Sequence, residues 1–211
     1  MRIIAGLHGG VESLRFERCG IFGLEALLEN IAKCCPELIN FALIKNNVRG
    51  ISETDSQALA LGISMLPNLQ VIDLGSNLLG NMGIRFLAPC LIKCSNLIQL
   101  ILNENDISDF GAQQLAGTLP ICVKLSKINL NHNEIANVGC VALAACLGFL
   151  PELEEVHLNG NRFGNSGAEA LASCIAHCKK LKVLSILANT DVGPLARHKI
   201  EDALLAKNSA V

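Results

Sequence analysis

The sequence has 211 residues, a length that suits one domain or a marginal two and that can bury a sizeable core. Hydrophobic residues make up 51% and charged residues 17%, and the formal net charge of −2 leaves no basic footprint for nucleic acid or for an anionic membrane surface. No run approaches the eighteen or more apolar residues of a membrane-spanning helix. We therefore expect neither nucleic acid nor a membrane as a partner.

The chain begins with a short apolar segment and two glycines, within Met1–Gly10. The segment is too short for a good secretory leader, and ten cysteines are too few for a disulfide scaffold, so free thiols in a reducing cytoplasm are expected. The N-terminal segment provides no separate polar cap, although the end units of a stacked array need one. We predict an uncapped N-terminal edge that could support self-association.

From Val11 onward the sequence repeats, for most of its length with a period of 28 residues. Each unit follows the pattern L-x-x-L-x-L-x-x-N, as in Leu97, Leu100, Leu102 and Asn105. The last position of the pattern is held by Asn46, Asn77, Asn105, Asn133, Asn161 and Asn189, with Cys19 in the first unit. Apolar residues two apart predict a short strand in the first half of each unit. Apolar residues at helical spacing predict a helix in the second half.

One strand and one helix per unit, stacked in parallel, predict an α/β solenoid of about seven units. Strands pair about 4.8 Å apart and helices are bulkier, so the parallel sheet becomes concave and the helices lie on the convex side. The repeated Asn can bond to backbone groups that the turn after each strand would leave buried and unpaired. Glycine recurs six residues after the Asn, at Gly83, Gly111, Gly139 and Gly167.

Two segments depart from the regular period. The unit between Asn46 and Asn77 is three residues longer, and the register places the extra residues in an exposed loop, Val48–Asp55. Residues 194–207 are predicted to form a C-terminal capping helix, because Pro194 suits a first helical position and Leu195, Ile200 and Leu204 can cover the last unit. We expect residues 1–211 to form a single domain with repeats over about 11–193.

The consensus L-x-x-L-x-L-x-x-N-x-[IL]-x-x-x-G-x-x-x-L resembles the ribonuclease-inhibitor-like class of leucine-rich repeats, from Val11 to about Gly193. The resemblance implies a right-handed horseshoe arc that binds a protein through its concave face. Similar repeats occur in the Ran GTPase-activating protein, in the C-terminal arrays of NOD-like receptors and in tropomodulin-like actin-capping proteins.

Residues beside the strand leucines are expected to face the concavity, because side chains alternate along a strand. The middle of this face is rich in amides, which both donate and accept hydrogen bonds, and an apolar diagonal of Ile44, Val71 and Ile101 lies beside it. The predicted partner-binding residues are Asp73, Gln99, Ile101, Asn103, Lys127, Asn129, Asn131, Glu155, His157 and Asn159. The alternative is that these residues are merely the polar surface of a solvated sheet.

Charged residues also keep the period. Lys124, Glu152 and Lys180 are spaced 28 residues apart, as are Glu154 and Lys182, and Lys127 and Glu155. Equal register in neighbouring units predicts ion pairs across the stack, each contributing about 0–1 kcal/mol.

The cysteines recur in register on the predicted buried helix face, where a free cysteine behaves as a small hydrophobic residue. Cys174, His177 and Cys178 lack the paired C-x-x-C arrangement of a structural zinc site, so no metal or cofactor is expected. The register brings no Ser or Cys together with a His and a carboxylate, so no catalytic triad is expected.

The sequence therefore favours a cytoplasmic protein-interaction scaffold and not an enzyme. One alternative is a GTPase-activating protein resembling the Ran regulator, in which Arg49 of the enlarged loop would stabilise the charge on the transferring phosphate. The acidic C-terminal tail typical of that family is missing. Another alternative is a ligand-sensing array that belongs to a larger receptor.

Overall fold

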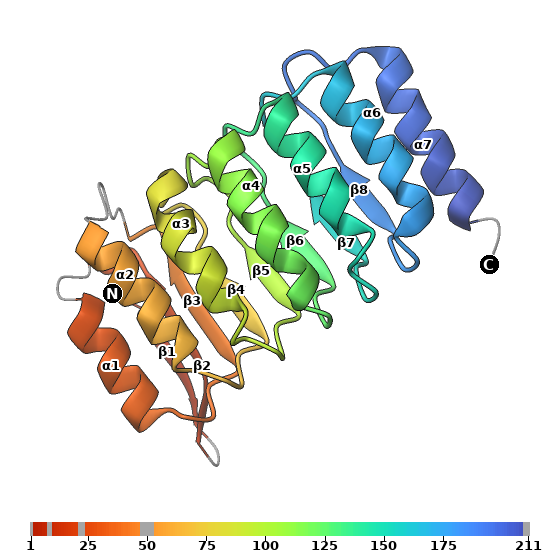
Figure 1. The fold of residues 1–211 in the computed structure, drawn as a ribbon. Coiled ribbons are helices and arrows are strands. Elements are labelled where there is room, and N and C mark those ends of the chain that lie inside the picture. The colour runs from red at the N-terminus through yellow and green to blue at the C-terminus, as the bar shows by residue number, and fades with distance from the viewer. Residues whose placement is uncertain (1, 8–9, 21–23, 47–52, 209–211) are drawn as a thin grey trace.

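The structure, a computed structural model, describes residues 2–7, 10–20, 24–46 and 53–208. It is a curved stack in which a row of helices covers one side of a single sheet, with successive units following each other in chain order (Figure 1). The strands are β1 (Arg2–Leu7), β2 (Val11–Glu17), β3 (Asn40–Ile44), β4 (Val71–Asp73), β5 (Gln99–Ile101), β6 (Lys127–Asn129), β7 (Glu155–His157) and β8 (Val183–Ser185). The helices are α1 (Leu24–Cys34), α2 (Glu53–Ser64), α3 (Gly80–Leu91), α4 (Asp109–Thr118), α5 (Asn137–Leu147), α6 (Asn165–Cys174) and α7 (Pro194–Asn208), with short 3₁₀ turns at Leu119–Ile121 and Ile175–His177.

The sheet runs in the order β1 to β8, and β2 to β8 are parallel. Every pairing between β4 and β8 joins residues 28 positions apart, such as Gln99 with Lys127, so the sequence period sets the register of the sheet. An α/β solenoid with parallel strands inside and helices outside is therefore confirmed.

The N-terminal segment, for which no separate polar cap was expected, forms a further strand of the sheet. Strand β1 folds back antiparallel on β2, from Arg2 opposite Glu17 to Leu7 opposite Val11, and covers the edge of the parallel sheet. The apolar run followed by glycines is a hairpin pattern, and Gly10 has a φ of +132° that a residue with a side chain rarely adopts. The edge strand of the described sheet is thus β1.

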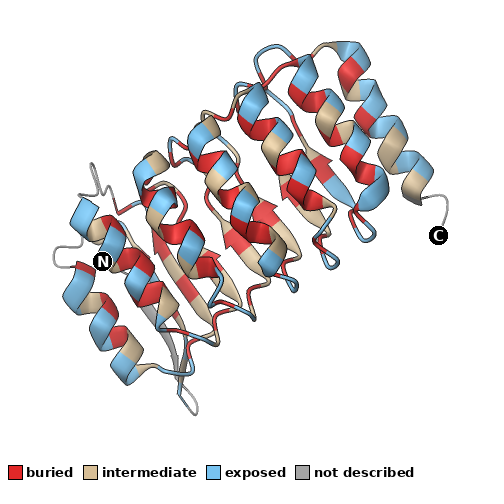
Figure 2. Cartoon of the chain, in the orientation of Figure 1, coloured by how far each residue is buried: buried red, intermediate tan, exposed pale blue. Residues whose placement is uncertain are grey.

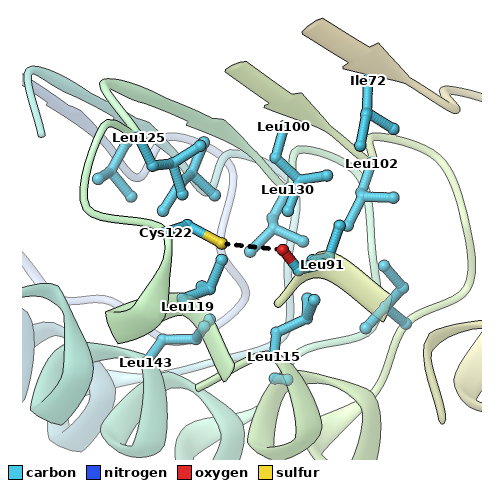
Figure 3. Close-up of a cluster of buried hydrophobic side chains, with 14 of the residues drawn as sticks. Ile72, Leu91, Leu100, Leu102, Leu115, Leu119, Cys122, Leu125, Leu130 and Leu143 are labelled. Atoms are coloured by element: carbon cyan, nitrogen blue, oxygen red, sulfur yellow. Dashed lines mark hydrogen bonds between the residues drawn. The ribbon is translucent and has the colours of Figure 1, made fainter. Parts of the chain in front are cut away.

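The core lies between the sheet and the helices. In Figure 3, Leu100 and Leu102, from β5 and just after it, and Leu130, just after β6, lie with Leu115 of α4, and all four are at most 1% exposed. Cys122 is part of this layer, and its thiol donates a hydrogen bond to the carbonyl of Leu91 in the preceding unit, at 3.8 Å (Figure 3). Close packing of this kind leaves no room for large changes in side-chain volume.

The departures from the period are partly described. Helix α2 begins at Glu53, so the last three residues of the predicted Val48–Asp55 loop are helical, and Arg49 lies outside the described residues. At the other end, α7 packs against α6 and buries Ile200, whereas Leu195 is 72% exposed. The expectation that Leu195 covers the last unit is wrong, because it lies at the start of α7 on the face turned away from the stack.

The six pattern asparagines form a row that we call the asparagine ladder. Each is at most 5% exposed, and each bonds to backbone groups of its own unit and of the preceding unit. The side-chain oxygen of Asn133 accepts hydrogen bonds from the N–H groups of Asn105 and Ile107, each at 3.0 Å. Its amide nitrogen donates to the carbonyls of Leu102 and Leu130, each at 3.0 Å. The ladder thus joins adjacent turns through their otherwise unpaired backbone groups.

Candidate functional site: the concave face

The concave face is made of columns of side chains that run across the strands. One column follows the register Val71, Gln99, Lys127, Glu155 and Val183, and a second follows Asp73, Ile101, Asn129, His157 and Ser185. A third column, two residues further along each unit, contains Asn103, Asn131 and Asn159. All ten predicted partner-binding residues lie in these columns and are partly exposed, as the partly buried strands in Figure 2 indicate.

Several of the concave amides bond to the protein itself. The side-chain oxygen of Asn131 accepts the N–H of Asn159 at 2.7 Å, and that of Asn159 accepts the N–H of Leu187 at 2.7 Å. Asn129 accepts the N–H of Asn131 at 3.0 Å. These contacts fix the rotamers of the amides, so a partner would meet a preorganised surface whose free groups are mainly the amide N–H donors.

Lys127, Glu155, His157 and Ser185 form one hydrogen-bonded network across β6, β7 and β8. The carboxylate of Glu155 lies 2.7 Å from the Lys127 ammonium and 3.1 Å from Nε2 of His157. Nδ1 of His157 lies 3.0 Å from the hydroxyl of Ser185. The bonds from Lys127 and His157 hold the pKa of Glu155 below its usual value, so the carboxylate stays ionised at neutral pH.

The expectation that no Ser, His and carboxylate come together is wrong in its geometry. Ser185, His157 and Glu155 are connected in the order of a catalytic triad. Glu155 lies two positions before His157 on β7 and Ser185 lies on the neighbouring strand β8, and both side chains reach the His157 ring. Lys127 shares the carboxylate, and the amide of Asn159 donates to the Ser185 hydroxyl at 3.1 Å. We interpret the network as mutual satisfaction of polar side chains on the concave face.

Asp73 differs from the other acidic residues of this face. Burial raises the pKa of its carboxyl, although the N–H of Gly75 donates to it at 3.1 Å and opposes the shift. Beside it the predicted apolar diagonal is shorter than expected: Val71 and Ile101 are partly exposed, but Ile44 is 8% exposed. Ile44 is therefore largely covered and adds little to the exposed apolar surface of the concave face.

Three of the ion pairs predicted from the period are confirmed, between Lys127 and Glu155, Glu152 and Lys180, and Glu154 and Lys182. The predicted contact between Lys124 and Glu152 is wrong, because the Lys124 ammonium donates to the side-chain oxygen of Asn96 at 2.7 Å instead. Lys180 lies 2.6 Å from Glu152 and Lys182 lies 2.9 Å from Glu154, and all four side chains are well exposed. Such pairs contribute little free energy because water screens them, but they favour the correct order of stacking.

The structure also bears on cofactors and membranes. Within the described residues, no three His, Cys, Asp or Glu side chains are grouped so that they could hold a metal ion. Cys174 and Cys178 are buried, whereas His177 is exposed, so this sequence cluster does not converge on one point. None of the described helices combines the length and the apolar character needed to cross a bilayer.

A second row of polar residues was missed in the sequence, although it keeps the same period. Asn81, Asp109, Asn137 and Asn165 stand at the start of their own helices, but each side-chain oxygen accepts N–H groups just before or at the start of the next helix. Asp109, for example, accepts the N–H groups of Ala136 at 2.8 Å and Gly139 at 2.7 Å. We call these four residues the capping row, since they satisfy helix N-termini across the unit boundary.

The fold and its concave face define an α/β leucine-rich-repeat solenoid. The model of a family described as Leucine Rich repeat matches residues 93–116, 122–144 and 151–172. A comparison with curated protein sequences finds no match.

Solved structures with the same fold include leiomodin-1 actin-binding site 2, at 17% identity and a TM-score of 0.59, covering 75% of this chain and 91% of that one. Another is the tropomodulin C-terminal domain of Caenorhabditis elegans, at 16% identity and a TM-score of 0.62, covering 74% of this chain and 95% of that one. At these identities the likeness establishes the fold alone.

Proposed function

We propose that this chain is a cytoplasmic protein-interaction scaffold of the ribonuclease-inhibitor-like class, without enzymatic activity, and that it binds its partner with the concave residues between Asp73 and Asn159. The observation that carries the proposal is the arrangement of ten polar and apolar side chains in three columns on one sheet, with rotamers held by hydrogen bonds. Free cysteines throughout are consistent with a reducing compartment.

The chemistry of the face favours a partner recognised through hydrogen bonds and apolar contacts more than through net charge. Lys127 and Glu155 neutralise each other, and Arg15 pairs with Glu17 at 3.1 Å. Ile101 and Gln99 stand beside each other in adjacent columns and offer an apolar side chain next to an amide. We therefore expect partner binding to change little with salt concentration.

The test compares affinity capture by the wild type, by a concave double variant and by a matched control. Gln99→Arg with Asn103→Arg places two bulky charges on the concave face at positions that contribute little to the internal bonding. Asn30→Arg with Gln57→Arg adds the same charges to exposed positions on α1 and α2. The concave variant should lose at least tenfold in recovery of specific partners, since interface charges without a counter-charge are costly, while the control retains them. Equal recovery by both variants would contradict the proposal.

One solved neighbour is named for actin binding, so purified actin is the first defined partner to test. Cosedimentation of the wild type with actin filaments, and binding to monomeric actin, use the same two variants. A concave-dependent interaction would identify the partner class, and its absence would leave the capture experiment to find another.

The other two functions considered from the sequence are separated from a scaffold by direct measurement. A GTPase-activating protein would stimulate GTP hydrolysis by a small GTPase, and Arg49→Ala would abolish the stimulation. A receptor array would bind a ligand only as part of a longer chain that carries a signalling domain.

A further inference from the structure

Helix α5 has an unusual surface for a helix on the outside of a protein. Its sequence, Asn137–Leu147, contains no charged residue. Val138 and Val141 face solvent at 58% and 46% exposure, and Phe149, just beyond the helix, is 71% exposed. A helix that is apolar on all sides is normally buried, so the outward face of α5 is one that another surface should cover.

The repeat provides its own comparison. The position of Val141 is held by Arg85 in α3, Gln113 in α4 and Glu169 in α6, and these residues are all exposed. The fold therefore accepts charged and polar residues at this position, and the valine is not required for stacking. Among α3, α4 and α6, helix α4 has the outward surface most similar to that of α5. Phe110 and Ile121 are each 50% exposed at the positions equivalent to Val138 and Phe149.

These five residues form what we call the convex patch: Phe110, Ile121, Val138, Val141 and Phe149. Helices α4 and α5 lie side by side at the middle of the helix row (Figure 1). Beside the patch runs a groove of about 500 Å³ between α5 and α6, and its lining is mostly apolar, including Ala144, Ala145 and Ala170. An exposed aromatic ring thus stands next to a groove of apolar character on the same face.

We propose that the convex patch is a homodimer interface in which two copies of this chain pack back to back about a two-fold axis. At such an axis each residue meets its own copy or a close neighbour, so any charge there would face a like charge. Charge-free α5 meets this requirement. With the axis between α4 and α5, the exposed side chains of α5 lie opposite those of α4 in the other copy. Phe149 then faces Ile121 and Val138 faces Phe110, which makes the patch complementary to itself.

The size of the patch agrees with a dimer. At the observed exposures of 46% to 71%, and taking about 150–200 Å² for a whole large apolar side chain, the five residues expose roughly 500 Å². A stable interface buries about 800 Å² per partner, of which roughly 60% is apolar. The convex patch therefore supplies about the apolar share of one side of such an interface.

The charges at the borders of the patch fix the orientation of the second copy. Arg85 on α3 and Glu169 on α6 hold equivalent positions on opposite sides of the α4–α5 pair. A two-fold axis parallel to the helices, between α4 and α5, places Arg85 of one copy opposite Glu169 of the other, twice in the dimer. Glu169 also lies 2.6 Å from Lys199 of its own chain, so it would be shared between two cations.

The experiment measures mass in solution by light scattering and sedimentation, using the full chain at about 50 μM, above the micromolar dissociation constant of a weak interface of standard size. The wild type should be a dimer. Val141→Glu should weaken dimerisation by about 100-fold or more, because it buries an unpaired charge in the interface. Helical content by circular dichroism should not change, since Glu169 occupies the same position in α6. Gln57→Glu on α2 is the matched control and should remain a dimer.

The orientation is tested by exchanging the border charges. Arg85→Glu alone and Glu169→Arg alone should each weaken the dimer, by about three- to tenfold, because each creates two like-charge contacts. The double variant, Arg85→Glu with Glu169→Arg, should recover most of the loss. Recovery in the double variant cannot arise from a merely structural effect of either residue.

Three results would overturn the proposal. One is a wild type that stays monomeric at 50 μM. Another is a dimer that Val141→Glu leaves intact, which would point to the β1 edge instead. The third is a mass that grows with concentration beyond the dimer, because a closed two-fold contact cannot extend. Each result leaves the concave-face proposal untouched, since the two faces lie on opposite sides of the molecule.

Discussion

Single asparagines on the ladder join two units at once. The oxygen of Asn105 accepts the N–H groups of Asn77 at 3.1 Å and Leu79 at 3.2 Å. Its amide nitrogen donates to the carbonyls of Leu74 at 2.8 Å and Asn103 at 3.1 Å. Because Asn105 is 0% exposed, bulk water cannot replace these four hydrogen bonds if the side chain is removed.

We predict that Asn105→Ala lowers the free energy of unfolding by about 3–5 kcal/mol, because each buried backbone group left without a partner costs about 1–3 kcal/mol. Asn103→Ala, two residues earlier and partly exposed, is the control and should change stability by less than about 0.5 kcal/mol. Urea denaturation followed by far-ultraviolet circular dichroism suits a chain without Trp or Tyr. Similar losses in the two variants would show that the ladder is not the main link between units.

The residue before each pattern position has a left-handed backbone in every unit that is described. The φ angles there are 52° at Arg18, 51° at Lys45, 58° at Ser76, 54° at Glu104, 54° at His132, 65° at Gly160 and 56° at Ala188. Glycine would suit this conformation, yet it occurs once. The sequence could not reveal this feature, because side chains of every kind hold the position and the stacking of the units imposes the angle.

At the scale of elements, helices α4 to α7 each begin against the capping-row residue of the preceding unit. The N–H of Gly139 lies 2.7 Å from the Asp109 carboxylate. A Cβ built on Gly139 would come within 2.6 Å of that oxygen and 2.8 Å of the Asp109 backbone. Gly139 is thus required by the close approach of two units and not by an unusual φ.

Gly139→Ala is expected to lower the free energy of unfolding by about 1–3 kcal/mol, because the new methyl group meets a backbone that cannot move aside cheaply. Gly117→Ala is the matched control, since it lies exposed in α4 with no atom within 4 Å of the added Cβ. The free energy of unfolding of this control should rise by about 0.5–1 kcal/mol, because alanine reduces the flexibility of the unfolded chain. Thermal denaturation of both variants measures the difference, and a neutral Gly139→Ala would refute the close-contact explanation.

At the scale of the whole molecule, the reactivity of four buried thiols in three units reports on cooperative unfolding. They are Cys94, Cys122, Cys140 and Cys146. Desolvation raises the pKa of Cys94, Cys140 and Cys146 to about 12, and that of Cys122 to about 11. Their folded pKa values lie above the ordinary value of 9.0, so the stability linked to the neutral thiols is complete below pH 9. It is lost progressively as the pH rises from about 9 towards 12.

We predict that a thiol reagent at pH 8 labels the exposed Cys34 rapidly, and labels these four cysteines only at the rate of global unfolding. Peptide mass spectrometry after timed labelling measures each rate separately. Since neighbouring units share their cores, the four rates should agree within a factor of about three. Labelling of Cys146 as fast as Cys34 in the folded protein would mean that the units open independently.

The sequence by itself determined the period, the strand and helix in each unit, the buried leucines and the side chains that share each concave column. These features depend on the alternation of neighbours along one unit and on a constant spacing between units, and both can be read along the chain. Only the tertiary structure decided that β1 pairs antiparallel with β2 at the end of the sheet, that Asp109 caps the helix of the next unit and that Ile44 is buried. Only it decided, too, that Ser185 reaches His157 and that the exposed side chains of α4 and α5 gather into one patch. Those features depend on distances between groups in different units, which packing sets and a one-dimensional pattern does not contain.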